Sequence, residues 1–476
     1  MLTPPPIPRH KTRIVATIGP ASAAQPVMER MLVAGMDVAR LNLSHGELDE
    51  HARVVERLRA AARAVGRRLA ILADLPGPKL RIGAFADEVV TLAAGDPFVL
   101  TPEPIVGDAT GVSVAFERLP EVVKPGGIVF LNDGLVQLEV REIAGREVRC
   151  RVVAGGELRS GKGLNLPGAE LGIEAFTPRD REGLRFALAE GLDAVSQSFV
   201  ESPDDVARVR EAAAELGGST FVIAKIERAR ALDRVAEILE AADGIMVARG
   251  DLGVEIPIED IAGVQKRLVR EANLRGKPVI TATHMLESMT EYTRPTRAEA
   301  TDVANAILDG TDAVMLSGES AVGRHPVESV AMLARIAASA ERRRPAHEAR
   351  AAIRSAAADG AVVEQIARAV DDMLTHLHPA AAIVPTRSGA TARRIARFRA
   401  PVWIVAVSTE PATCQRLQFT WGVQAVCVER EPDDWRGFAR AWLDAHELDG
   451  RLVVLVQGPS PERPDASHRV EVLEVP

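Results

Sequence analysis

Short apolar runs rich in valine and isoleucine alternate with amphipathic stretches over most of the chain before Arg342. Such runs, followed by helical patterns, are typical of parallel strands buried on both faces of an α/β sheet. The pattern predicts eight strands, at 13–19, 37–44, 69–75, 193–200, 221–227, 244–251, 278–283 and 313–317. Amphipathic stretches such as 204–216 and 231–241 lie between them. Eight βα units in one chain predict a (β/α)8 TIM barrel.

One long segment between the third and fourth predicted strands has a different pattern of apolar and polar residues. It contains short alternating or apolar runs at 88–94, 98–101, 127–131, 136–143 and 147–153. Turn residues separate these runs, notably Asn132-Asp133-Gly134 and Ala144-Gly145. This pattern predicts a small all-β domain of β-barrel type at 76–172, inserted after the third strand. Because it leaves from the rim where catalysis gathers in such barrels, we expect it to act as a lid.

The pattern changes again after residue 344. Helical periodicity covers 361–377 and 390–397, and strand-like runs occupy 381–384, 402–407 and 452–456. This alternation predicts a separate open α/β domain at 344–476, with Arg342-Arg343-Arg344-Pro345 as the linker. The barrel would then consist of 1–75 and 173–343.

Composition narrows the class of protein. The chain has 476 residues, of which 47% are hydrophobic and 26% charged, so about three domains with large cores are feasible. A net charge of −8 argues against a nucleic-acid partner. The three cysteines lack metal-ligand spacing and fit a reducing cytosol. The proline-rich start is unlike a secretory signal, and no run approaches the ~20 apolar residues of a membrane span.

Charged residues terminate two neighbouring apolar runs. One run ends in Lys225-Ile226-Glu227 and the next in Arg249-Gly250-Asp251. Lys225 and Glu227 are two positions apart, so on a strand they point to the same side. Two carboxylates beside an ammonium suit a divalent metal that handles a phosphorylated carboxylate. A structural salt bridge among Lys225, Glu227 and Asp251 is the alternative that spacing leaves open.

Other predicted strands also end in polar residues that could bind ligands, and each of these residues also has a purely structural explanation. Arg40 offers forked donors for phosphate, and Asn42 and Ser44 are suited to a cation or a nucleotide phosphate, unless this is only a polar strand exit. Asp74 precedes a rigid Pro-Gly-Pro loop that a structural ion pair would also explain. Thr283 closes the seventh strand, where a buried β-branched residue is equally common.

Two further segments offer backbone or hydroxyl donors. Gly250 and Gly253 stand where a helical turn begins, so free N–H groups there could hold a carboxylate or phosphate, or the glycines could serve a tight turn. In the last domain, Ser388 and Thr391 lie between a strand and a helix, which suits either a phosphate pocket or a capped helix start.

Taken together, these segments resemble the pyruvate kinase family from about residue 12 to 456. The motifs that carry the resemblance lie at 40–46, 162–168, 225–227, 246–255, 283–289, 294–306 and 315–320. The resemblance implies a barrel, an inserted β lid and a C-terminal domain. It also implies transfer of phosphate from phosphoenolpyruvate to ADP, giving pyruvate and ATP, by a cytoplasmic homotetramer. Rival functions are another barrel lyase or mutase acting through an enolate, and a non-catalytic sensor.

By matched position, the resemblance assigns roles to the metal and phosphoryl residues. Glu227 and Asp251 would bind Mg²⁺, with Mn²⁺ as a substitute. Lys225 would stabilise the phosphoryl group in flight, and Arg40 would touch the phosphate.

The same resemblance places the two substrates. Asn42 and His45, with Arg40 beside them, would seat the nucleotide. Backbone N–H groups of Gly250 and Asp251, with the Thr283 hydroxyl, would hold the substrate carboxylate. Protonation of the enolate would take place near Thr283.

Two departures from the family pattern alter these expectations. Lys79 stands at a position where most potassium-requiring members of the family that this chain resembles have glutamate. An ammonium close to Asn42, Ser44 and Asp74 would supply the charge of K⁺, which predicts potassium-independent activity, whereas a solvent-facing lysine would not. The tail at 458–464 lacks the Gly-rich stretch that completes an effector pocket in many relatives, so an effector phosphate at Ser388 and Thr391 stays an open alternative.

Overall fold

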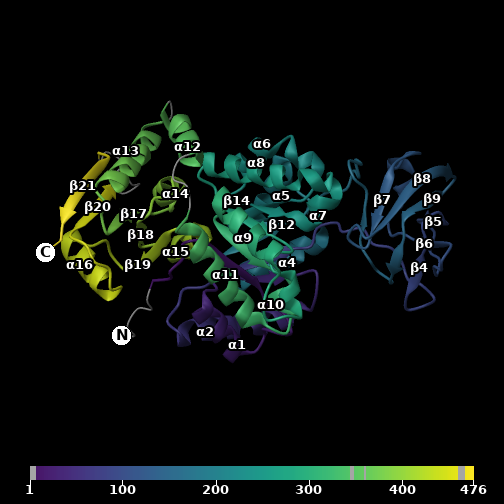
Figure 1. The fold of residues 1–476 in the computed structure, drawn as a ribbon, viewed down its shortest axis with the longest axis horizontal. Coiled ribbons are helices and arrows are strands. Elements are labelled where there is room, and N and C mark those ends of the chain that lie inside the picture. Colours follow the sequence, from purple (N-terminus) through teal and green to yellow (C-terminus); the bar gives the residue numbers. More distant parts are fainter. Residues whose placement is uncertain (1–6, 344–347, 359–360, 459–466, 476) are drawn as a thin grey trace.

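The computed structural model describes residues 7–343, 348–358, 361–458 and 467–475. Three parts stand in a row, with the barrel in the middle, the β insert at one end and the C-terminal domain at the other (Figure 1). Arg344 and Pro345 of the predicted linker and residues 459–464 of the tail lie outside the described residues.

The central part is a closed barrel of eight parallel strands. In spatial order they are β1 (Arg13–Thr17), β16 (Ala313–Leu316), β15 (Val279–Ala282), β14 (Gly244–Ala248), β13 (Phe221–Ile226), β12 (Ala194–Gln197), β3 (Ala70–Leu75) and β2 (Val38–Asn42). Val15, Leu72, Ile223, Met246 and Ile280 fill the interior and are almost fully buried. The barrel prediction is therefore confirmed, because each apolar run supplies one wall strand.

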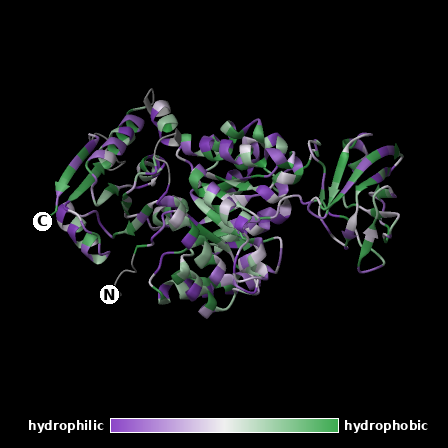
Figure 2. Ribbon diagram, viewed as in Figure 1, coloured by the Kyte–Doolittle hydropathy of each residue, from purple (hydrophilic) through white to green (hydrophobic). Residues whose placement is uncertain are grey.

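Helices surround the barrel and bury their apolar stripes against its outer face. They are α1 (Gln25–Ala34), α2 (Leu48–Ala64), α4 (Pro178–Ala189), α5 (Pro203–Glu215), α6 (Val235–Ala241), α7 (Arg249–Glu255), α8 (Ile261–Leu274), α9 (Arg297–Asp309), α10 (Gly318–Ala321) and α11 (Pro326–Glu341). Figure 2 shows the apolar strands at the centre and mixed helices around them. The helix predicted at 231–241 is divided, because the 3₁₀ turn Ala229–Leu232 precedes α6.

Several predicted strands end earlier than expected, and one of these corrections changes the site. The strand expected at 244–251 ends at Ala248, and α7 begins at Arg249. Asp251 therefore lies in the first turn of a helix and not on a strand. Backbone groups that leave the barrel wall lose their ladder partners and are satisfied within a helical turn instead.

The insert lies between β3, which ends at Leu75, and α4, which begins at Pro178. Its strands are β4 (Val90–Leu92), β5 (Pro97–Thr101), β6 (Gly111–Ser113), β7 (Ile128–Leu131), β8 (Val136–Ala144), β9 (Glu147–Ala154), β10 (Gly156–Leu158) and β11 (Leu164–Asn165), with a short helix α3 (Leu119–Val122). They form a six-stranded sheet in the order β11-β7-β8-β9-β5-β6 and a two-stranded sheet β10-β4. The strands of the expected β-barrel are thus divided between two sheets around a common apolar core.

The C-terminal domain is an open α/β layer structure, as predicted. Its sheet runs β19 (Val423–Cys427), β18 (Trp403–Ser408), β17 (Ala381–Pro385), β20 (Leu452–Gln457) and β21 (Arg469–Glu474), with only β21 antiparallel. The helices are α12 (Glu348–Ala358), α13 (Val362–His376), α14 (Ala390–Ala396), α15 (Pro411–Arg416) and α16 (Trp435–Ala445).

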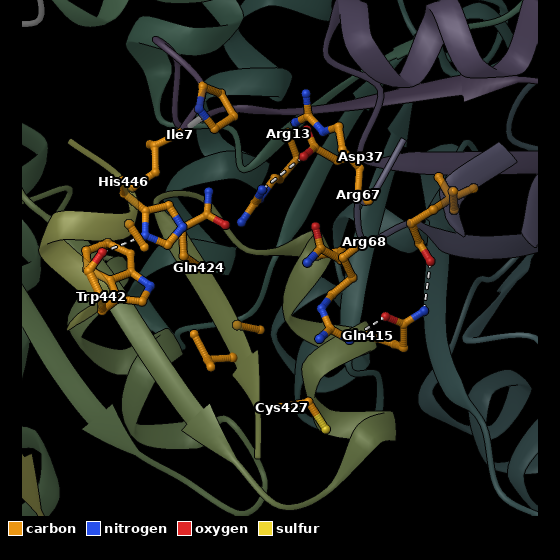
Figure 3. Close-up of a pocket in the computed structure, with 18 of the residues that line it drawn as sticks. Ile7, Arg13, Asp37, Arg67, Arg68, Gln415, Gln424, Cys427, Trp442 and His446 are labelled. Carbon is orange, nitrogen blue, oxygen red and sulfur yellow. Dashed lines mark hydrogen bonds and ion pairs between the residues drawn. The ribbon is translucent and has the colours of Figure 1, made fainter. Parts of the chain in front are cut away.

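The C-terminal domain contacts the end of the barrel where the strands begin. Arg399 donates to Asp312 at 2.9 Å, just before β16, and Arg13 at the start of β1 donates to the carbonyl of Thr420 at 3.0 Å. A cavity of about 810 Å³ lies in this junction. Figure 3 shows Arg68 directed toward Gln415, to which it donates at 2.9 Å. The rim formed by the strand ends lies at the other end of the barrel. None of the described helices is both long and apolar enough to cross a membrane.

Candidate active site

A buried ion pair joins the ends of β2 and β3. The Arg40 guanidinium donates to Asp74 Oδ2 at 2.9 Å through Nε, and to Thr17 Oγ1 at 2.9 Å through Nη1. Asp74 Oδ1 accepts from Ser196 Oγ at 2.6 Å. Burial alone would raise the pKa of Asp74, but Arg40, Lys225 and the Ser196 hydroxyl hold it below its ordinary value. Arg40 is therefore fixed in one orientation and Asp74 stays ionised.

Lys225 lies at the centre of the rim, on β13. Its ammonium donates to Ser198 Oγ at 2.6 Å and lies 3.2 Å from Glu227 Oε2 and 3.7 Å from Asp74 Oδ1. Burial alone would lower the pKa of Lys225, but Asp74, Glu227 and Asp251 raise it above the ordinary value. The side chain is consequently a permanent cation at neutral pH.

Glu227 follows β13 and is only 1% exposed. Oε1 accepts a hydrogen bond from the Phe199 N–H at 2.8 Å, whereas Oε2 is buried without a hydrogen-bond partner. Burial raises the pKa of this carboxyl, Lys225 opposes the rise and Asp251 adds to it. A buried carboxylate oxygen without a donor is the kind of atom that a cation satisfies. The residues present thus fit a divalent metal.

Asp251 approaches the same region from α7. Its Oδ1 lies 3.9 Å from Lys79 Nζ, and its charge acts on both Lys225 and Glu227. Among the described residues, no cluster of three or more His, Cys, Asp or Glu side chains could hold a metal. A metal between Glu227 and Asp251 would have two protein carboxylates and would need other oxygens, as is usual for Mg²⁺.

Thr283 follows β15 in a strained conformation. Its φ is +67°, which is an outlier for a β-branched residue. The hydroxyl accepts from the Gly250 N–H at 2.8 Å and donates to the Ala282 carbonyl at 2.6 Å, and Arg249 donates to the Thr283 carbonyl at 2.8 Å. The Gly250 N–H, expected from the sequence to hold a substrate carboxylate, is therefore bonded to Thr283 in this structure.

The residues expected at the nucleotide lie in the loop after β2. Asn42 Oδ1 accepts from the Ser44 N–H at 3.2 Å, and His45 is exposed. Burial lowers the pKa of His45, and the neighbouring charges of Arg81, Lys79, Arg40 and Arg179 lower it further. This loop is thus surrounded by cations, which suits a polyphosphate.

Lys79 lies between the barrel and the insert. A Cβ built on Gly163 would lie 3.3 Å from Lys79 Cε, so the lysine stem runs beside the insert. Within the described residues, the carboxylate with which Lys79 forms an ion pair is that of Asp251, at 3.9 Å. The Lys79 side chain is 34% exposed, so it is partly buried.

Ser388 and Thr391 lie far from this rim, at the junction of β17 and α14. Ser388 Oγ accepts from the Ala390 N–H at 3.4 Å, and its carbonyl accepts from Arg393 at 3.1 Å. Gly389 between them has φ +77° and begins the helix. They form a tight turn in a separate domain.

The sequence analysis did not single out Thr17, Ser196, Ser198 or Phe199, although all four contact the site. One usable signal was present, because Ser196 and Ser198 are two apart at the end of a predicted strand, like Lys225 and Glu227. Phe199 carried no signal, since its contribution comes from a backbone N–H.

A second buried ion pair joins the insert to the rim. Arg228 pairs with Glu255 of α7, donates to Glu201 at 3.0 Å and donates to the Ala169 carbonyl at 3.0 Å. Burial raises the pKa of Glu255 to about 7, although Arg228 opposes this. The chain segment that returns from the insert is therefore held by a carboxyl that titrates near neutrality.

Glu255→Gln should flatten part of the pH dependence of stability. Because the folded pKa exceeds the ordinary 4.5, the native state holds a proton that the unfolded state loses, so stability falls as pH rises from about 4.5 to 7. Between pH 4.5 and 7, the wild type should lose about 3 kcal/mol more unfolding free energy than the variant. Denaturant unfolding at several pH values measures it, and parallel curves for both proteins would contradict the expectation.

Comparisons with known proteins agree with this architecture. A family model described as "Pyruvate kinase, barrel domain" matches residues 9–330, and "Pyruvate kinase, alpha/beta domain" matches 364–473. A pyruvate kinase of Thermococcus litoralis is 50% identical over 426 residues, covering 89% of this chain and 90% of the relative. Pyruvate kinase 2 of Synechocystis is 42% identical over 461 residues, covering 95% and 77%. The crystal structure of a Cryptosporidium parvum pyruvate kinase superposes with a TM-score of 0.92 at 33% identity, covering 98% and 97%.

Proposed function

The chain belongs to the pyruvate kinase family and is a phosphotransferase, and from this premise we propose that it transfers the phosphoryl group of phosphoenolpyruvate to ADP, giving pyruvate and ATP. The observation that carries the proposal is the pair of groups after β13. The Lys225 ammonium forms an ion pair with Glu227 Oε2 at 3.2 Å, and this buried oxygen accepts no hydrogen bond. Phosphoryl transfer depends mainly on positioning and charge neutralisation, and such a pair serves both.

Glu227 and Asp251 hold the divalent cation in this proposal, as Mg²⁺ or Mn²⁺. When bound, the cation supplies Lewis-acid neutralisation of phosphoryl and enolate oxygens. Support comes from the chemistry of the donors, since both are hard carboxylate ligands and one of them is otherwise unsatisfied.

Lys225 and Arg40 neutralise the phosphoryl group as it moves. Lys225 remains protonated because three carboxylates raise its pKa. Arg40 is already oriented by Asp74 and Thr17, so little reorganisation is needed when phosphate arrives. Both cations therefore act as fixed charges and not as proton donors.

Thr283 serves the substrate carboxylate and the enolate. We expect the carboxylate to replace the Thr283 hydroxyl as acceptor of the Gly250 N–H, with the Asp251 N–H beside it. The hydroxyl is then released close to where a proton must be delivered. Asn42 and His45 seat ADP in the loop surrounded by Arg81, Arg40 and Arg179.

A coupled assay of pyruvate release tests the proposal. We expect pyruvate only when phosphoenolpyruvate, ADP and Mg²⁺ are all present, with ATP formed in equal amount. Pyruvate without ADP would favour the lyase or mutase alternative. Metabolite binding without turnover would favour a sensor.

Potassium independence is a finer prediction from Lys79. The ammonium lies beside Asp251 and contributes to the positive field at His45, so it occupies the region where an added monovalent charge would act. We expect full activity in K⁺-free buffer, and a gain of K⁺ dependence in Lys79→Glu. Strong stimulation of the wild type by KCl, relative to a matched tetramethylammonium control, would contradict this.

We extend the proposal to a cytoplasmic homotetramer. Light scattering on the purified protein would test the tetrameric state.

An effector phosphate at Ser388 and Thr391 is a separate question. Titration with sugar phosphates, followed by velocity curves for Ser388→Ala, would show whether this turn binds one.

A further inference from the structure

The corner where the chain leaves β12 contacts both functional groups of β13. Ser198 Oγ accepts from the Lys225 ammonium at 2.6 Å and donates to the Leu75 carbonyl at 2.7 Å. The next residue, Phe199, donates its backbone N–H to Glu227 Oε1 at 2.8 Å. Two consecutive residues thus hold the cation and the carboxylate that the reaction is proposed to use.

The residue that donates to Glu227 also has a left-handed backbone. Its φ is +59°, a conformation that bulky residues rarely adopt. Such a conformation persists when its surroundings force it. With Oε1 occupied by this N–H, Oε2 is the oxygen that accepts no hydrogen bond and faces the Lys225 ammonium at 3.2 Å.

The surroundings of the corner explain why it is rigid. Gln197 Nε2 donates to the Ser198 carbonyl at 2.9 Å and to the Ala175 carbonyl at 2.8 Å. Gly77, at the start of the insert, packs against the corner so closely that an added Cβ would lie 2.8 Å from Phe199 Cδ2 and 3.0 Å from Ser198 Cβ. Gln197 and Gly77 therefore both contact the corner formed by Ser198 and Phe199.

We propose that Ser198 and Phe199 are positioning residues: the left-handed Phe199 N–H determines which oxygen of Glu227 is presented to the divalent metal, and Ser198 fixes the Lys225 ammonium beside it. The metal's role rests on the proposed function. The Phe199 side chain is secondary, because the backbone donor makes the contact.

The conformation of residue 199 can be separated from its ring. Phe199→Asn and Phe199→Val both remove the ring, but asparagine tolerates positive φ and a β-branched valine does not. Mn²⁺ binding, measured by electron paramagnetic resonance without substrates, should weaken by about 10–100-fold in the valine variant and stay near wild type in the asparagine variant. Equal affinity in valine variant and wild type, or equal loss in both variants, would overturn the proposal.

A second replacement keeps the test decisive if the valine variant does not fold. Phenyllactic acid at position 199 retains the ring and replaces the backbone N–H with an ester oxygen, so it should weaken Mn²⁺ binding by a similar factor. Unchanged affinity would refute the role of the N–H.

Ser198→Ala should lower kcat by about tenfold or more and leave Mn²⁺ affinity unchanged. Unchanged kcat would refute the Ser198 half.

Failure of the proposed function gives a different result. A wild-type protein that binds Mn²⁺ but makes no ATP would refute the reaction and leave the metal titrations of the corner variants valid. A wild type that makes ATP while the corner variants bind metal normally would refute the corner alone.

Discussion

Replacing Lys225 with methionine is expected to lower kcat by about 10³-fold in the coupled assay. The ammonium lies within 4 Å of Ser198, Glu227 and Asp74 and is the buried cation next to the proposed metal carboxylate. Methionine has a similar length and shape but no charge, so the transferring phosphoryl group would lose one of its two fixed cations. Because Asp74 keeps Arg40 and Ser196, we expect the variant to remain folded.

Lys266→Met is the matched control for this variant. Lys266 is on α8, is largely exposed and pairs with Asp309 away from the rim. It should retain wild-type kcat. Thermal melting of both variants separates lost chemistry from lost folding. A Lys225→Met enzyme with near-normal kcat would remove Lys225 from the reaction.

Glu227→Gln is expected to have opposite effects on activity and on stability. Loss of a metal ligand should reduce kcat/KM by about 10²–10³-fold. Burial raises the pKa of Glu227, so above its ordinary pKa the native state has to keep an unfavourable buried charge or a proton. Stability therefore falls as pH rises above the ordinary glutamate range. The neutral isostere avoids this cost, and the metal-free variant should melt at a higher temperature than metal-free wild type near pH 8.

The metal response is the second half of this prediction. Mn²⁺ at about 100 times its dissociation constant should stabilise the wild type by about 2.7 kcal/mol and should leave Glu227→Gln unchanged. Glu237→Gln, on the exposed face of α6, serves as control and should respond like wild type. A normal metal-induced shift in Glu227→Gln would contradict the assignment of Glu227 as a ligand.

The barrel could be predicted from the sequence because each strand is buried on both faces. Ile223 and Met246 point into the barrel while Val222 and Ile245 pack under the helices, so their segments are apolar throughout. Because these segments are apolar throughout, the charged residues that end them could be recognised in the sequence. Lys225 and Glu227 share one side because they are two positions apart, and parallel strands bring Asp74 of β3 to the same rim.

Features that depend on tertiary packing could not be predicted in this way. The left-handed conformations of Phe199 and Thr283 contradict local preference and exist only because neighbouring elements impose them. The ion pair of Lys79 with Asp251 was not predicted, because Asp251 was expected on a strand and lies in the first turn of α7 instead. The Gly250 N–H was expected to be free, and a side-chain rotamer of Thr283 engages it.

The C-terminal domain packs on the end of the barrel where the strands begin. Selection on its surface is therefore separate from selection on the reacting groups at the opposite rim. The contacts that unite the two domains, such as Arg399 with Asp312, lie a full strand length from Lys225. Mutations can therefore accumulate in the outer domain of a lineage without disturbing the reacting groups, provided that this seam is kept. Chimeras that exchange the domain at the seam between related chains should inherit their chemistry from the barrel donor.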